Sequence, residues 1–400
     1  MSPKSLELNW KDEFSRWYPE ADVEVVTDWK YRRDAQVYIV NYEKFALRNA
    51  NAEEFYKFCQ KLGKYKDSMI VLDEAHRIKN RKAKSSTRLC SLRTKFDKAL
   101  ALTGTPAHNK VEDVWNVLHF VYPKEHTSYW KWLDEWCAFK NEYTPNGIVK
   151  VPNGIRKDKL SQFTSYINKH AIMRKRSEVM NWQTDVDVVD IRLPATPRQL
   201  RYIADLNKKF FTKDKETIVE CKAVLDRLIR IRQICNAPEL LKLSGTSPKV
   251  EWCKQYIKDF PEQSVLFFSN SKLTLRLLER ELKAAIICGD TPAEERRTLT
   301  QQFQSGKIKV LLLQTQACKE GLTLDKADTT IFIDTYPPLA DYLQAKDRMV
   351  ASTAEMVKPR VVYRLMLAGT FDEVIYRLVD ANKTTTDIVN NFKEVANGVS

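Results

Sequence analysis

Two adjacent carboxylates are the residues of this chain best placed to carry out chemistry. Asp73 and Glu74 directly follow residues 69–72, an unbroken apolar run typical of a strand buried on both faces of a parallel sheet. In open α/β sheets, ligands bind at the carboxyl edge of the strands. A carboxylate there can hold Mg²⁺ beside substrate phosphates, and its neighbour can orient or deprotonate a water for attack on phosphorus. For a bare Asp-Glu pair, however, a solvated acidic turn after a buried strand is the commoner explanation.

The composition predicts a soluble intracellular protein. The 400 residues allow two or three domains, and 43% of them are hydrophobic. The net charge of +14 favours a polyanionic partner, although a generally basic protein fits it equally well. The eight cysteines show no Cys-x-x-Cys spacing, so neither zinc nor a disulfide framework is expected. No apolar run approaches the roughly 18 residues that a membrane span requires.

The sequence Asp-Glu-Ala-His (73–76) at the end of an apolar strand resembles the Walker B box, motif II, of superfamily 2 helicases and translocases. Further segments resemble, in the correct order, the other signatures of Swi/Snf-type translocases. They are motif Ia at 3–14, Ib at 37–43, III at 98–106, an Arg-rich segment at 172–179, a Cys-x-x-Pro signature at 229–238, IV at 264–269, V at 315–324, VI at 344–348 and a terminal Gly-Thr-x-Asp-Glu at 368–373. From this ordered series the chain is identified as a member of that family.

The resemblance implies an α/β fold with two RecA-like parallel-sheet lobes. Strands that alternate with helices in the second half of the chain point the same way. We expect the first lobe, incomplete, at residues 1–180, a helical connector and linker at 181–248, and the second lobe at 249–400. An aromatic segment at 129–139 should pack a helical insertion. The short insertions and compact body favour a bacterial or phage member that acts in the cytoplasm.

The implied function is a DNA-dependent ATPase motor that couples ATP hydrolysis to movement on double-stranded DNA. By the family's pattern Asp73 holds Mg²⁺, Glu74 aligns the lytic water, and Arg348 is the arginine finger. The alternative for Arg348 is a helical arginine paired with a neighbouring carboxylate. The family's second arginine is Ala351 here, so either Arg348 acts alone, another cation such as Lys346 substitutes, or hydrolysis is weak. The residues implied for coupling are His76, Thr103, Gly104, Thr105 and Gln344. Those implied for nucleic-acid contact, mainly with backbone phosphates, are Lys4, Tyr42, Ser269, Thr315 and Gly321.

The phosphate-binding loop Gly-x-x-x-x-Gly-Lys-Ser/Thr, or Walker A, does not occur in these 400 residues. Because the sequence opens inside motif Ia, we expect truncation before or within that motif and the loss of a central strand. The chain alone should then be a poor ATPase with a less stable first lobe, unless an upstream polypeptide supplies the loop. The alternative is a non-catalytic DNA-binding or assembly module that kept the fold. The missing loop and Ala351 favour that module, whereas the intact Asp73 and Glu74 favour the motor.

One charged segment has no assigned role. Residues 77–93 carry many basic side chains and no acidic one. Phosphate contact and a merely solvated helix face explain this segment equally well.

Overall fold

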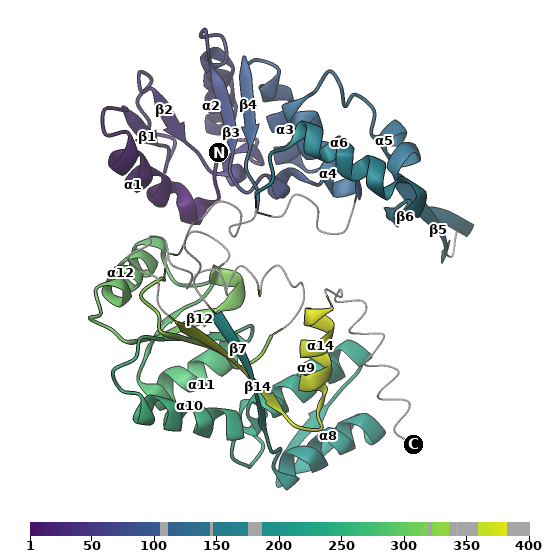
Figure 1. Cartoon of the computed structure of the whole chain (residues 1–400), viewed down its shortest axis with the longest axis vertical. Helices are drawn as coiled ribbons and strands as arrows, with labels where there is room; N and C mark the ends of the chain where they lie inside the picture. The colour runs from purple at the N-terminus through teal and green to yellow at the C-terminus, as the bar shows by residue number, and fades with distance from the viewer. Residues whose placement is uncertain are drawn as a thin grey trace. The chain divides into compact units, whose positions relative to one another are not determined.

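The computed structural model describes residues 1–104, 111–144, 147–174, 186–318, 322, 324–335, 342 and 359–381. The chain divides into two compact units, Met1–Val179 (unit 1) and Met180–Ser400 (unit 2) (Figure 1). Each unit has its own hydrophobic core. They are therefore described separately.

Unit 1 contains two short pairs of parallel strands. The pairs are β1 (Val23–Val25) with β2 (Val37–Ile39), and β3 (Met69–Leu72) with β4 (Lys98–Ala101). The first two residues of the chain lie between them. The backbone nitrogen of Met1 donates to Val71 O at 2.8 Å, and Ser2 N donates to Val40 O at 2.9 Å. Two residues of backbone therefore link β3 to β2.

Helices surround these strands and build a second cluster in unit 1. They are α1 (Glu7–Trp17), α2 (Ala50–Leu62), α3 (Lys84–Arg93), α4 (Val111–Val121), α5 (Tyr129–Trp136) and α6 (Leu160–His170), with short 3-10 turns η1 (Lys4–Leu6), η2 (Tyr42–Phe45), η3 (Ala75–Ile78) and η4 (Lys157–Lys159). Asn49 and Ser128 cap the first turns of α2 and α5 through their side chains. Trp132, Trp136 and Phe163 form the core of the second cluster.

The aromatic segment expected to pack a helical insertion is helical only in its first part. After α5 the chain forms an antiparallel hairpin, β5 (Cys137–Thr144) and β6 (Gly147–Ile155). Apolar residues lie on one face of α5, whereas the residues after Trp136 show no alternation of apolar and polar residues that would have indicated a strand.

Unit 2 contains a six-stranded parallel sheet. Its order is β11 (Ala285–Ile287), β12 (Val310–Gln314), β10 (Val265–Ser269), β13 (Thr329–Phe332), β14 (Arg360–Leu367) and β7 (Val186–Leu193). All five residues of the central strand β10 are buried, as expected of a strand covered on both faces. The expected α/β class is thus confirmed, and this sheet is larger than either strand pair of unit 1.

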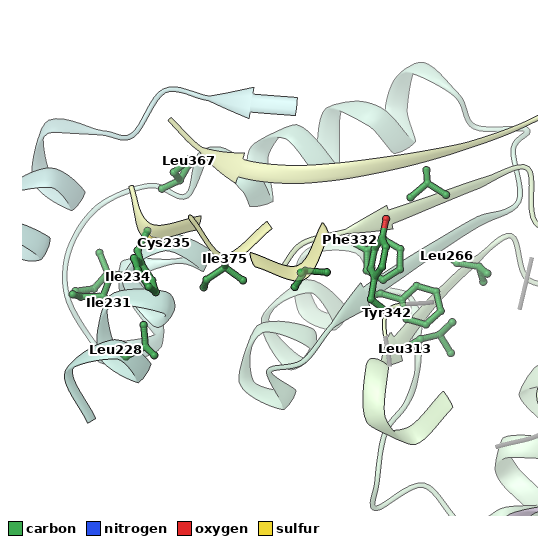
Figure 2. Close-up of a cluster of buried hydrophobic side chains, with 14 of the residues drawn as sticks. Leu228, Ile231, Ile234, Cys235, Leu266, Leu313, Phe332, Tyr342, Leu367 and Ile375 are labelled. Carbon is green, nitrogen blue, oxygen red and sulfur yellow. The ribbon is translucent and has the colours of Figure 1, made fainter. Parts of the chain in front are cut away.

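Helices cover both faces of this sheet. They are α8 (Pro197–Lys209), α9 (Val224–Asn236), α10 (Pro248–Asp259), α11 (Lys272–Leu282), α12 (Ala293–Gln304) and α14 (Phe371–Asp380), with η5 (Pro238–Leu241), η6 (Thr315–Cys318) and a hairpin of β8 (Phe211–Asp214) and β9 (Thr217–Glu220). Alternate residues of β10 divide between two clusters: Phe268 packs with α9 and α14, and Phe267 packs with α10 and α11. Figure 2 shows the first cluster, in which Ile231 and Ile234 of α9 lie near Ile375 of α14. Phe332 stacks on Phe268 with ring centres 5.1 Å apart.

Residues 181–248, where a helical connector and linker are expected, are part of unit 2. Its strand β7 pairs with β14 over eight residues, from Val186 opposite Arg360 to Leu193 opposite Leu367. Its helix α9 buries Leu228, Ile231 and Ile234 against the sheet. Burial of apolar residues accounts for α9, whereas β7 is a mostly exposed strand at the end of the sheet and is held by its pairing with β14.

Among the helices that the structure describes, none is both long enough and apolar enough to cross a bilayer.

Candidate active site

The carboxylate of Asp73 is held from both sides at the end of β3. Its Oδ1 accepts a hydrogen bond from the Glu74 amide at 2.9 Å, and its Oδ2 accepts one from Trp10 Nε1 at 2.8 Å. The backbone is fixed too, because Asp73 N donates to Met1 O and Asp73 O accepts from the Tyr42 hydroxyl at 2.6 Å. Helix α1 and the turn η2 therefore position this carboxylate.

Trp10 is the site residue that sequence reasoning missed. The helical spacing of apolar residues in the first segment indicated core packing for its tryptophans, yet Trp10 is half-buried and hydrogen-bonded to Asp73. Trp17, at the end of the same helix, is 71% exposed. No local pattern distinguishes the two residues, since Trp10 and Asp73 are 63 residues apart in the sequence.

Glu74 has a left-handed backbone conformation, with φ of 51° and ψ of 50°. Such a conformation is uncommon for a residue with a side chain, costs about 1–3 kcal/mol and is found most often at functional sites. Glu74 lies between the end of β3 and the start of η3. The Oε2 atom of Glu74 is buried, accepts no well-aligned hydrogen bond from the described residues and lies 3.2 Å from His76 Nδ1.

His76 lies between the acidic pair and the end of β4. Its Nδ1 is 3.4 Å from the hydroxyl of Thr103. The backbones run together here as well, because Ala75 N donates to Leu102 O at 2.8 Å and Leu102 N donates to Leu72 O at 2.7 Å. The structure thus brings His76 and Thr103 together, with Gly104 as the next residue. Thr105 lies outside the described residues.

The donor set of this edge suits Mg²⁺ bound together with phosphates. The described residues contain no group of three or more metal-ligating side chains. Mg²⁺, however, commonly uses one or two carboxylates and takes its other ligands from water and substrate phosphates. Each Asp73 oxygen accepts one hydrogen bond from an N–H group and keeps a further lone pair. Asp73 can therefore hold the ion, with Glu74 adjacent.

The residues expected to contact nucleic acid differ in accessibility. Lys4 is exposed. Tyr42 is 5% exposed, and its burial together with the nearby Asp73 raises the pKa of the phenol. Ser269 is fully buried, and its hydroxyl donates to Asp334 Oδ2 at 3.0 Å, while Thr315 is 2% exposed. In this conformation Tyr42, Ser269 and Thr315 therefore offer almost no accessible surface to a nucleic acid.

Ser269 belongs to a buried polar network that the sequence did not reveal. Asp334 accepts hydrogen bonds from Asn270 N at 2.7 Å and from the Asn236 amide. Asn236 also accepts from Lys249 Nζ at 3.2 Å, and this fully buried ammonium lies 2.7 Å from Asp372. The Cys-x-x-Pro and Gly-Thr-x-Asp-Glu segments are therefore joined beneath the edge of the sheet.

Three of the remaining expected site residues lie outside the described residues. They are Gly321, Gln344 and Arg348.

Comparisons with known proteins agree with the motif order. Residues 1–240 match the SNF2-related domain, and residues 248–351 match the Helicase conserved C-terminal domain. The chain belongs to the SNF2-related family. The identification as an ATPase core of the Swi/Snf type, within superfamily 2, is thus confirmed.

Relatives of this family member include large chromatin-associated proteins. The chain is 26% identical to the ISWI chromatin-remodeling complex ATPase ISW2 of Saccharomyces cerevisiae, over 93% of this chain and 34% of that protein. It is 27% identical to the ATP-dependent DNA helicase DDM1 of Arabidopsis thaliana, over 93% of this chain and 52% of that protein. The chain thus spans about a third to a half of the length of such relatives. Their eukaryotic origin gives no support to the expectation of a bacterial or phage source.

One solved structure in the comparison is the Sulfolobus solfataricus SWI2/SNF2 ATPase core in complex with dsDNA. It is 21% identical, with a TM-score of 0.40, over 99% of this chain and 81% of that chain.

Proposed function

We propose that this family member is the motor core of a DNA-dependent ATPase that couples ATP hydrolysis to movement along double-stranded DNA. One observation carries the proposal: Asp73 and Glu74 lie side by side at the carboxyl edge of β3, one fixed by two hydrogen bonds and the other in a strained conformation. Phosphoryl transfer needs such fixed charges more than covalent chemistry. The family match over residues 1–240 and 248–351 supports the same reading.

The proposed roles follow from these positions. Asp73 holds Mg²⁺, which when bound with ATP neutralises charge on the phosphates. Glu74 orients the attacking water and accepts its proton. His76 contacts the Thr103 hydroxyl, and through this contact a movement of Asp73 and Glu74 is passed on to the end of β4. Arg348 is the proposed cation that meets the developing charge.

We further propose that this chain alone hydrolyses ATP weakly. Its sequence lacks the glycine-rich loop whose amides and lysine hold phosphates, so a second polypeptide or an upstream segment would have to supply it. The same observation favours the second candidate function, a DNA-binding or assembly module without catalysis. The two functions differ in whether ATP hydrolysis can be restored.

The test is DNA-stimulated ATP hydrolysis by the purified chain, alone and with a polypeptide that carries the loop. The motor proposal expects duplex binding and slow hydrolysis alone, a faster DNA-stimulated rate with the added polypeptide, and loss of that rate in Glu74→Gln. Duplex binding without any restored hydrolysis would favour the module. Strong hydrolysis by the chain alone would refute the proposed dependence on a second polypeptide.

A further inference from the structure

The basic segment 77–93 forms a charged surface that the proposed motor chemistry does not use. The structure pairs part of its charge with carboxylates of neighbouring elements. The ion pairs are Arg77–Glu43 at 3.3 Å, Lys79–Asp113 at 3.5 Å and Arg88–Glu53 at 2.7 Å. These residues are accounted for as surface ion pairs.

The cations in the middle of the segment have no such partners among the described residues. Lys82 and Lys84 are exposed, and within the described part of unit 1 neither they nor Arg81 forms an ion pair with a carboxylate. Two ammonium groups two residues apart repel each other, and a bound anion would relieve that repulsion. The charge of this surface therefore fits an anionic ligand.

An aromatic pair lies against Arg81, one of these cations. The guanidinium carbon of Arg81 is 4.3 Å from the ring centre of Tyr129 and 5.9 Å from that of Trp130. Tyr129 also packs edge-on against Trp115, so it is anchored to the core of unit 1. Trp130 remains 66% exposed at the start of α5. A large aromatic ring is thus held beside the Arg81 guanidinium, with much of its surface open.

We propose that Arg81, Lys82, Lys84 and Trp130 form a second nucleic-acid contact, which binds an unpaired stretch of strand next to the duplex. This rests on the proposed function, because it assumes that the chain binds DNA. The cations suit phosphates, and the indole offers a face on which a base can stack. Bases inside a duplex are already stacked on their neighbours, so an exposed aromatic ring selects an unpaired base.

The experiment compares binding of a labelled blunt duplex with binding of the same duplex carrying an oligo(dT) extension. We expect the extension to raise the affinity of the unchanged chain. Trp130→Ala should remove most of that gain, about tenfold for one stacked base, and Trp130→Phe should retain most of it. Trp17→Ala is the matched control, because Trp17 is 71% exposed and has the Arg16 guanidinium 4.8 Å from its ring, and it should change nothing.

The lysines are tested by the salt dependence of the same affinities. The double change Lys82→Gln and Lys84→Gln should reduce the salt dependence for the extended substrate more than for the blunt duplex. The control is the double change Lys64→Gln and Lys66→Gln. Both lysines follow α2 in the chain and are exposed. Thermal unfolding of each variant checks that unit 1 stays folded.

Failure of this inference can be told apart from failure of the proposed function. If the unchanged chain does not bind the blunt duplex, the proposed function fails. If it binds the duplex but gains nothing from the extension, or keeps the gain in Trp130→Ala, the second contact is wrong. If the variants lose the same affinity for the blunt duplex as for the extended one, the surface binds the duplex backbone and the second contact is wrong. Binding of a polyglutamate peptide that the lysine changes abolish, with the extension gain intact, would assign it to an acidic protein.

Discussion

At the scale of single residues, the account depends on how Asp73 is held. A hydrogen bond to a charged group contributes about 1.5–3 kcal/mol when it is well shielded, and Trp10 is only half-buried. We therefore expect Trp10→Phe to lower the free energy of unfolding of unit 1 by about 1–2 kcal/mol. Urea unfolding measures the change. Trp17→Phe is the control and should have almost no effect, since Trp17 donates only to the exposed Glu13.

The backbone of Glu74 gives a second prediction at this scale. A left-handed conformation costs an ordinary residue about 1–2 kcal/mol, and glycine avoids that cost. Glu74→Gly should therefore be more stable than Glu74→Ala by about 1 kcal/mol, although both lose the carboxylate. Equal stability of the two variants would mean that the backbone leaves this conformation when the side chain is removed.

At the scale of elements, the end of α6 packs on a buried histidine. His126 is 4% exposed, and Tyr166 of α6 contacts its Nε2 at 2.9 Å. Burial is the main cause that lowers the pKa of His126. Its hydrogen bond with the Tyr122 carbonyl opposes this shift, and the nearby His170 lowers the pKa further. The unfolded state then binds more protons than the folded state just below the ordinary histidine pKa of about 6.5. Stability of unit 1 should fall as the pH drops below about 6.5.

Unfolding in urea at several pH values tests this sign. His126→Gln should weaken the pH dependence, because glutamine keeps a polar group but does not titrate. A dependence that stays the same in the variant would place its origin in other groups of unit 1.

The buried network gives the prediction for unit 2. Lys249 is fully buried and paired with Asp372, so removing one charge strands the other. Lys249→Met should lower the stability of unit 2 by about 3–5 kcal/mol. The double change Lys249→Met and Asp372→Asn should recover part of the loss, because no uncompensated charge remains. A double variant as unstable as the single one would show that the other hydrogen bonds of Lys249 dominate.

Secondary-structure elements could be predicted from the sequence where a local pattern of residue types marks them. Contacts between residues far apart in the chain could not. The strand before Asp73 and the buried strand β10 are readable from residue types alone. The expectation that the strand before Asp73 is buried on both faces was wrong, because Ile70 and Leu72 are buried whereas Met69 is 48% exposed. The bond from Trp10 to Asp73 and the pairing of β7 with β14 depend on residues far apart in the chain, and no local periodicity encodes them. Burial of Tyr42 and Ser269 was missed for the same reason, since both hydroxyls are bound by distant partners.

At the scale of the whole molecule, the two units differ in how completely their sheets are formed. Among the described residues, unit 2 has six parallel strands in one sheet, whereas the parallel strands of unit 1 form only two pairs, linked through Met1 and Ser2. A sheet with few paired strands gains less from burial and pairing. We expect unit 1 to unfold before unit 2 in denaturant, which hydrogen exchange resolved by segment can measure. A single cooperative transition with equal protection in both units would contradict this.

The most direct test of the motor proposal is ATP-dependent movement on DNA. A triplex-forming strand bound to duplex DNA is displaced when a translocase moves through it. With the phosphate-binding loop supplied on a second polypeptide, this chain should displace the third strand in the presence of Mg²⁺ and ATP, and Glu74→Gln should bind the DNA but displace nothing. Binding of the DNA with no displacement by the unchanged, loop-supplied chain would contradict the account.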